Sequence, residues 1–171
     1  MESSNLNDYG EPVIDRPSMP EGYGLGSPGV TFTPLPWSWA VERLTAARNY
    51  WIATTRSDGQ PHVSPVWGLW QDNRFMFSTD SSSTKAKNLR RNPSMVMHLE
   101  SGDEVVVLNG HAVVARNPSR LNAFADEYYR KYEIRPETGP TAAPVFELQT
   151  ETALGWLERD FPSTATRWTF G

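Results

Sequence analysis

Short runs of aromatic and β-branched residues, separated by turn residues, constrain the fold of this chain more than any other feature of its sequence. These runs lie at 50–55, 62–70, 74–80, 94–101, 103–116, 145–158 and 167–170. Strands that recur every 8–12 residues or so, joined by tight turns, are typical of all-β barrels and sandwiches. We therefore expect a mainly β protein, a β-barrel with flanking helices.

Glycine and proline locate the irregular points in these strands. Residues 57–59 (Ser-Asp-Gly) and 72–73 (Asp-Asn) are predicted to be turns. Pro65 predicts an edge strand or a bulge, because proline cannot donate a hydrogen bond to a ladder. Gly110 and Gly155 are predicted to mark β-bulges within their strands.

Three segments carry helix signals instead. We expect helices from Trp39 to about Asn49 with Ser38 as N-cap, within 81–93, and from Arg120 to about Tyr132 after an Asn117–Ser119 cap. In the third helix Phe124, Tyr128 and Tyr132 recur at i, i+4 and i+8. They are therefore predicted to form one aromatic face.

The first 36 residues differ from the rest of the chain. They are rich in proline, glycine and serine and follow no helical or strand period. We expect residues 1–36 to be an extended arm that drapes over the domain or is mobile. Residues 37–171 are expected to form one β-barrel domain.

Composition excludes several classes of function. The net charge of −4 and pI of about 5.4 disfavour nucleic-acid binding. The chain has no cysteine and only three histidines, so we expect no disulfide and no metal site. No apolar run approaches the ~20 residues of a membrane span, and the N-terminus is not a signal peptide. These features predict a soluble cytoplasmic protein without a membrane partner.

A cluster of hydroxyls and cations follows the third strand-like run. Ser78 and Thr79 end that run, and Lys85, Lys87 and Asn88 open the next helix. Hydroxyl groups, free amides at a helix start and clustered cations are the ingredients of a phosphate site. The alternative is a solvated helix face with surface lysines.

A second informative stretch covers residues 58–70, where Trp67 and Trp70 flank the strand that contains Pro65. The strand offers a backbone edge and an aromatic wall to a flat heterocycle. The alternative is ordinary core packing of alternate residues. We identified no catalytic acid or base.

Several motifs occur in a characteristic order. They are W-I-A-T-T-R-x-D-G-Q-P-H-V-S-P-V-W, F-x-F-S-T-D, S-T-K-A-K-N-L-R-R-N-P and V-M-H-L-E. Together they closely resemble the pyridoxamine-5′-phosphate-oxidase-like, FMN-binding split β-barrel family. Within it the chain is most similar to the actinobacterial branch that uses the deazaflavin F420. The resemblance covers about Trp37 to Phe170.

The resemblance implies roles for particular residues. Lys85 would bind the cofactor phosphate, with Lys87 and Asn88 in the same loop–helix motif. Ser78 and Thr79 would touch the ribityl chain and phosphate. The strand beside the ring system would comprise His62, Val63, Ser64, Pro65, Val66 and Trp67.

The chain departs from the family pattern at one point. The family usually has an arginine immediately before the phosphate lysine or two residues before it. Thr84 and Ser83 occupy those positions here. The guanidinium group is therefore missing from the phosphate site, although the two hydroxyls can still donate hydrogen bonds.

The family also implies a function. The chain is expected to be a homodimer that binds F420 in a groove between subunits and transfers a hydride to a small conjugated organic acceptor. One alternative is an FMN-dependent oxidase or reductase of the same family. Another is a non-catalytic protein that binds flavin, haem or a tetrapyrrole. The sequence identifies neither the substrate nor the direction of hydride transfer.

Overall fold

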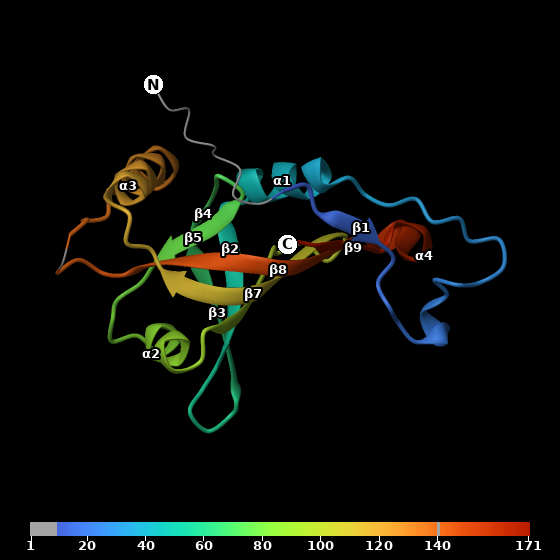
Figure 1. Ribbon diagram of the computed structural model, residues 1–171, viewed down its shortest axis with the longest axis horizontal. Coiled ribbons are helices and arrows are strands. Elements are labelled where there is room, and N and C mark those ends of the chain that lie inside the picture. The colour runs from blue at the N-terminus through green and yellow to red at the C-terminus, as the bar shows by residue number, and fades with distance from the viewer. Residues whose placement is uncertain (1–9, 140) are drawn as a thin grey trace.

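The computed structural model describes residues 10–139 and 141–171, which form one antiparallel sheet with helices around it (Figure 1). Residues 1–9 of the predicted arm and Pro140 lie outside the described residues. The strands are β1 Val13–Asp15, β2 Asn49–Thr55, β3 Pro61–Trp67, β4 Leu69–Gln71, β5 Arg74–Ser78, β6 Ser94–His98, β7 Glu104–Val114, β8 Val145–Leu157 and β9 Thr166–Thr169. The helices are η1 Glu21–Tyr23, α1 Trp37–Ala46, α2 Thr84–Arg91, α3 Pro118–Tyr132, η2 Glu158–Asp160 and α4 Phe161–Thr164.

Strand β8 organises the sheet because it pairs with three other strands. It pairs with β7 along nearly its whole length, with β5 through its first half and with β9 through its second half. The strand order is β1-β9-β8-β7-β6-β2-β3, and β4 is attached through β5. Because β5 pairs with β8 on the side opposite to β7, the sheet curls into a barrel. The predicted mainly β barrel with flanking helices is confirmed.

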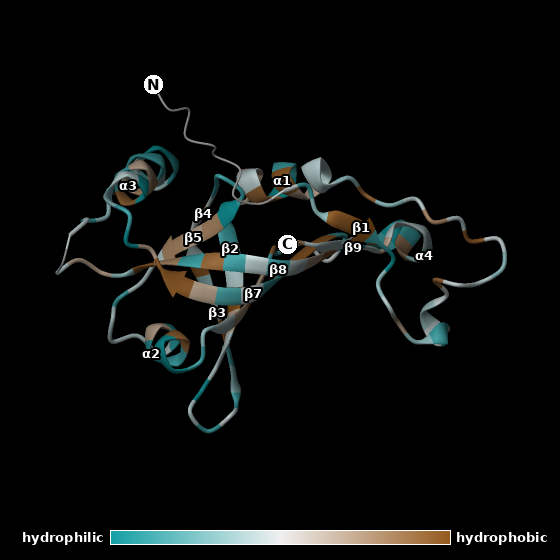
Figure 2. Cartoon of the chain, in the orientation of Figure 1, coloured by the Kyte–Doolittle hydropathy of each residue, from teal (hydrophilic) through white to brown (hydrophobic). Residues whose placement is uncertain are grey.

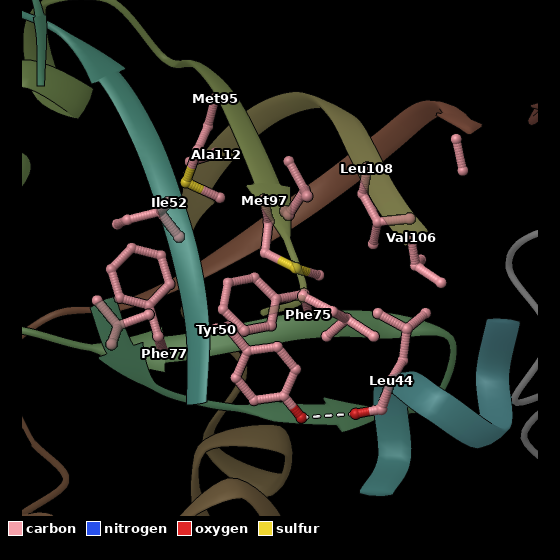
Figure 3. Packing of buried hydrophobic residues seen from close by; sticks show 14 of the residues in the cluster. Leu44, Tyr50, Ile52, Phe75, Phe77, Met95, Met97, Val106, Leu108 and Ala112 are labelled. Carbon is pink, nitrogen blue, oxygen red and sulfur yellow. Dashed lines mark hydrogen bonds between the residues drawn. The ribbon is translucent and has the colours of Figure 1, made fainter. Parts of the chain in front are cut away.

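The barrel interior is filled by alternate residues of its strands. Figure 3 shows Tyr50 and Ile52 of β2 pointing toward Phe75 and Phe77 of β5. Leu44 of α1 closes one end of this core, and the Tyr50 hydroxyl donates to the Leu44 carbonyl at 2.6 Å. Each such side chain contributes about 1.5–3 kcal/mol by leaving water. The helices show both apolar and polar colours, as expected for helices with one buried face (Figure 2).

The first helix begins two residues earlier than predicted. Helix α1 starts at Trp37 after Pro36, and Ser38 is therefore not its N-cap. Proline fits this position because its fixed φ suits a helix start and no N–H is needed there. The helix ends at Ala46 instead of continuing to Asn49, because Asn49 is the first residue of β2.

The other two predicted helices are present. Helix α2 lies within 81–93, and the Ser83 hydroxyl accepts from Ala86 N–H at 3.3 Å. Helix α3 begins at Pro118 instead of Arg120, with Asn117 as the N-cap. Its predicted aromatic face is buried, at Phe124, Tyr128 and Tyr132. Most of that face packs beneath β4 and β5.

One predicted bulge is confirmed and the other is wrong. The β7–β8 register shifts between Asn109 and Gly110, so Glu151 on β8 is the extra residue. A Cβ at Gly110 would lie 1.9 Å from the Gln149 carbonyl oxygen, which explains the glycine. Gly155 pairs regularly within the ladder. Its role is steric, because a Cβ there would lie 2.6 Å from the ring of Trp168.

The predicted strand over 62–70 is broken into two. β3 ends at Trp67 and β4 begins at Leu69, and Gly68 forms the break. Only glycine fits there, because a Cβ would lie 2.5 Å from a ring carbon of Phe75. The edge position predicted from Pro65 is confirmed, since β3 ends the strand order. The turn at Asp72 and Asn73 is also confirmed, with φ of 51° and 58°.

Segments near the two ends of the chain pack together. β1 pairs with β9, and the Asp15 carboxylate accepts two hydrogen bonds from Arg167 at 2.8 and 2.6 Å. Leu25 and Leu35 are buried. The sequence predicted neither β1 nor α4, which lie together at one end of the molecule (Figure 1). Residues 10–36 therefore lie against the C-terminal segment.

A buried ion network joins α3 to the barrel. Glu147 of β8 is 2% exposed and binds two arginines, Arg74 of β5 and Arg120 of α3, the latter at 2.9 Å. Glu147→Gln removes the charge that both guanidinium groups face. We predict that the free energy of unfolding falls by about 3–5 kcal/mol. Urea denaturation measures it, with the exposed Glu151→Gln as control. An equal stability of the two variants would contradict the role of Glu147.

Candidate functional site

The outer edge of β3 carries no further strand in the part of the chain that the structure describes. Within residues 10–139 and 141–171, β3 pairs only with β2, and Arg56 N–H donates to the Gln60 carbonyl at 2.9 Å where the hairpin starts. Hydrogen-bonded and non-bonded pairs alternate along an antiparallel ladder. Counting from the Arg56–Gln60 pair, the main-chain groups that face outward belong to Pro61, Val63, Pro65 and Trp67. The prolines fit because an outward position needs no N–H donor.

Two buried side-chain atoms of β3 lack hydrogen-bond partners. His62 Nδ1 and Ser64 Oγ are buried and have no hydrogen bond to any described residue. A buried polar atom without a partner costs about 1–3 kcal/mol. Native structures rarely leave such groups unpaired unless a water or ligand satisfies them. A water or a ligand beside β3 would supply the missing partners.

The hydroxyls at the end of β5 meet the start of α2. Thr79 Oγ1 lies 3.2 Å from Ser83 Oγ, and Ser78 Oγ donates to the Pro144 carbonyl at 3.4 Å. Helix α2 then opens with Thr84 and Lys85, whose N–H groups precede the first intrahelical hydrogen bond. The helix dipole makes this start favourable for an anion.

The two predicted lysines do not share one side of α2. Residues two positions apart point about 200° away from each other around a helix. Lys85 is half-buried, whereas Lys87 is exposed. Asp80 has a lowered pKa because its carboxylate accepts hydrogen bonds from Ser82, and Lys87 adds a smaller attraction. Lys85 is thus the better placed of the two to bind a ligand.

Asn88 anchors α2 to the hairpin. Its Nδ2 donates to Thr54 Oγ1 at 3.0 Å, and both side chains are buried. Thr54 is the ladder partner of His62, and its hydroxyl donates to the His62 carbonyl at 3.4 Å. The contact places the cationic helix beside the His62 end of β3. A cofactor-binding role for Asn88 stays a prediction.

The opposite end of β3 is aromatic. The ring of Trp67 is stacked on that of Tyr132 at 4.7 Å with an interplanar angle of 5°, yet Trp67 remains 38% exposed. The second tryptophan of the predicted wall, Trp70, lies beyond the Gly68 break and packs edge-on against Trp37 at 5.9 Å. Only Trp67 therefore borders the open edge.

The two ends define an elongated site. Five residue steps of about 3.3 Å separate His62 from Trp67, a span of about 17 Å. An anion-binding helix start lies at one end, a backbone edge runs along the middle and an exposed indole lies at the other end. The arrangement suits a ligand with a phosphate at one end and a flat ring at the other.

The sequence did not identify the residues that support the aromatic end. Lys131 Nζ donates to the Tyr50 hydroxyl at 3.0 Å and to the Gly68 carbonyl at 3.1 Å. The Arg48 guanidinium lies 5.8 Å from the centre of the Trp67 ring. The i, i+4, i+8 pattern of α3 revealed its aromatic face. Nothing local indicated that this face would reach the Gly68 break.

An open barrel with these features defines a split β-barrel protein, and comparison with known proteins identifies its family. The sequence model of the pyridoxamine 5′-phosphate oxidase family matches residues 40–157, so the chain belongs to this family. The predicted family is confirmed. The family includes oxidoreductases, and its members bind flavins. No curated protein matches the chain at a significant level.

Solved structures share this fold at low sequence identity. A conserved hypothetical protein from Mycobacterium tuberculosis is 23% identical, with a TM-score of 0.64 over 74% of this chain and 88% of its own. A protein described as an F420 reductase is 22% identical, with a TM-score of 0.50 over 66% and 94%. A heme-binding protein from Mycobacterium smegmatis is 14% identical, with a TM-score of 0.55 over 76% and 62%.

In residues 10–139 and 141–171, no three metal-ligating side chains are grouped so that they could hold a metal ion. The same residues contain no helix that is both long and apolar enough to cross a membrane.

Burial changes the titration of the groups at the aromatic end. It lowers the pKa of the Lys131 ammonium to about 8, and the nearby Arg48 charge adds to the effect. Burial also raises the pKa of Tyr50 and raises that of Tyr132 to about 12. The two hydroxyls therefore stay protonated under conditions in which Lys131 loses its charge.

The lowered pKa of Lys131 predicts a pH-dependent stability. Between pH 8 and about 10 the unfolded chain keeps a proton on Lys131 that the folded chain has released. Stability therefore rises with pH in this window, until the unfolded tyrosines begin to ionise. Urea denaturation at several pH values should show this rise in wild type and in Lys87→Met, and a smaller rise in Lys131→Met. The same rise in all three would contradict the assignment.

Proposed function

We propose that this protein is an oxidoreductase that binds F420 along the open edge of β3 and transfers a hydride to a small conjugated organic acceptor. The observation that carries the proposal is the unpaired β3 edge, with the unpartnered His62 Nδ1 and Ser64 Oγ on the adjoining face. It runs between the cationic start of α2 and the exposed ring of Trp67.

The residues present fit such a cofactor. Lys85 and the hydroxyls of Ser78 and Thr79 would hold the phosphate, helped by the free N–H groups at the start of α2. The hydroxyls of Ser83 and Thr84 stand where an arginine is usual in this family and would donate neutral hydrogen bonds. The outward main-chain groups of β3 would bind the polar edge of the ring, and Trp67 would border it.

The chemistry divides between the cofactor and the chain. When bound, F420 supplies the hydride chemistry. The chain's own residues would bind and orient the cofactor: Lys85 would hold its phosphate, the β3 edge would bind its ring, and Trp67 would limit access of water to the ring end. Holding two reactants in position lowers the barrier to transfer without any catalytic acid or base.

F420 is preferred over FMN on two grounds. The order of motifs from Trp51 to Glu100 resembles the F420-dependent branch, and a solved F420 reductase shares the fold. FMN is the alternative, in an oxidase or reductase. The shared fold of a heme-binding protein supports a second candidate function, non-catalytic binding of flavin, haem or a tetrapyrrole.

Titration of the purified protein separates these functions. We expect F420 fluorescence to be quenched with saturation, and we expect the reduced cofactor to be consumed when a conjugated acceptor such as a quinone is added. A protein that purifies yellow with flavin absorption would support FMN instead. Saturable haem binding without turnover of either flavin would support the non-catalytic function and contradict ours.

Replacement of Lys85 tests the phosphate end. Lys85→Ala removes a charge-assisted contact worth about 1.5–3 kcal/mol, so the dissociation constant for F420 should rise roughly tenfold to over a hundredfold. Lys87→Ala should cause a smaller rise, because Lys87 points away from Lys85 around the helix. Fluorescence titration measures both. Unchanged affinity in Lys85→Ala would refute this phosphate site.

We also propose that the chain is a homodimer, as is typical of the family. A row of three apolar residues and one histidine crosses the outer face of the barrel through directly paired residues. Trp51 pairs with His98, His98 with Val107, and Val107 with Leu154. The rings of Trp51 and His98 are stacked at 6.4 Å. These side chains are half-buried in one protomer, and a second copy would complete their burial.

The dimer is tested by placing a charge in this row. Val107→Glu should convert the dimer to a monomer, because an unpaired carboxylate cannot be buried at low cost. Analytical ultracentrifugation measures the mass. Ile134→Glu, at an exposed position after α3, should remain a dimer. A wild-type mass equal to one chain would rule the dimer out.

The division of the chain at residue 36 is likewise a proposal. It is supported by the family match, which begins at residue 40, and by the first strand of the barrel proper, which begins at Asn49. The described part of the arm is attached to the barrel through β1, which adds to β9, and through Leu35, whose N–H donates to Thr166 Oγ1 at 2.9 Å. Its contacts therefore lie at the end of the sheet away from α2.

A further inference from the structure

The break between β3 and β4 is held by side chains of α3 in place of a strand ladder. Gly68 lies between the two strands, where the regular pairing of β3 with β2 stops. It is buried, so its N–H and carbonyl need partners from elsewhere. Tyr132 and Lys131, the last two residues of α3, supply them.

Tyr132 and Lys131 together provide hydrogen-bond partners for the main-chain groups around Gly68. Gly68 N–H donates to the Tyr132 hydroxyl at 3.0 Å. That hydroxyl has one proton and lies 2.6 Å from the Arg48 carbonyl and 2.8 Å from the Gly68 carbonyl. Lys131 Nζ donates to the Gly68 carbonyl at 3.1 Å, which leaves the tyrosine proton for Arg48. The Gly68 N–H, the Gly68 carbonyl and the Arg48 carbonyl therefore all have partners only when both Tyr132 and Lys131 are present.

The same tyrosine also fixes the residue before the break. The Trp67 ring lies parallel to the Tyr132 ring, with centres 4.7 Å apart. Tyr132 therefore contacts the Trp67 ring and also binds the peptide group that joins Trp67 to Gly68. The Arg48 guanidinium lies 5.5 Å from the centre of the Tyr132 ring and 5.8 Å from that of Trp67.

Lys131 likewise makes two contacts, both of them hydrogen bonds from its ammonium group. Its ammonium bridges the Gly68 carbonyl and the Tyr50 hydroxyl, and Tyr50 is a fully buried core residue of β2 (Figure 3). Lys131 therefore joins the last turn of α3 to the barrel core and to the strand break at once. Within the described residues Lys131 forms no ion pair with a carboxylate. Its hydrogen-bond partners are neutral oxygens, the Tyr50 hydroxyl and the Gly68 carbonyl.

We propose that Tyr132 and Lys131 are positioning residues for the proposed cofactor site along β3, which act by holding Gly68 and thereby setting the place of Trp67 at the end of β3. This inference rests on the proposed function. Neither residue needs to touch the cofactor. Their effect passes through the Gly68 peptide and the Trp67 ring, which border the aromatic end of that site.

The test compares Tyr132→Phe with Tyr129→Phe. The first variant keeps the stacked ring and removes the hydroxyl, whereas the second changes an exposed tyrosine on the same helix. In Tyr132→Phe we expect the Trp67 indole N–H resonance to shift or broaden and the F420 dissociation constant to rise about fivefold. Tyr129→Phe should behave as wild type. The resonance is assigned by its absence in Trp67→Phe.

Lys131 is tested by loss and rescue. Lys131→Met should move the same resonance and weaken F420 binding, and Lys131→Arg should restore both because it keeps a charged donor. Variants that melt at lower temperature but keep the wild-type resonance and affinity would overturn the proposal. If wild type binds no F420, the proposed function fails. The resonance still decides whether these residues hold Trp67.

Discussion

The candidate site follows from one feature of the sheet, the outer edge of β3, which no described strand covers. β8 pairs with β5 on one side and β7 on the other, which curls the sheet and leaves β3 at its end. Open edges invite pairing with other strands, and proteins limit this with prolines and short strands. Pro61 and Pro65 occupy two of the outward positions and cannot donate a hydrogen bond. These prolines therefore disfavour pairing of a further strand with this edge.

Each end of that edge is fixed by a helix. At one end Asn88 ties α2 to Thr54, and so brings the start of the helix beside His62. At the other end α3 reaches the Gly68 break, and the Glu147 network holds the first turn of α3 to β8. The candidate site is therefore a strand edge with a different helix at each end. Both helices pack against the same barrel.

Much of the fold could be predicted because alternation and turn residues are local signals. Most of the strands, the helix within 81–93 and the edge position of Pro65 follow from such signals. Gly155 shows the limit: its lack of a side chain makes room for Trp168, a contact between residues on neighbouring strands. The contacts of Lys131 and Tyr132 with the Gly68 break were missed for a similar reason. Their partners at Gly68 and Arg48 are more than sixty residues away in the chain, and no pattern within one helix indicates them.

A crystal structure of the protein with F420 bound would show directly whether the cofactor binds along β3. We expect the cofactor phosphate to lie within hydrogen-bond distance of Lys85 Nζ and the start of α2, and the ring to meet the outward main-chain groups of β3 near Trp67. A cofactor bound elsewhere, with the Lys85 ammonium in open solvent and the β3 edge covered by another strand, would contradict this placement.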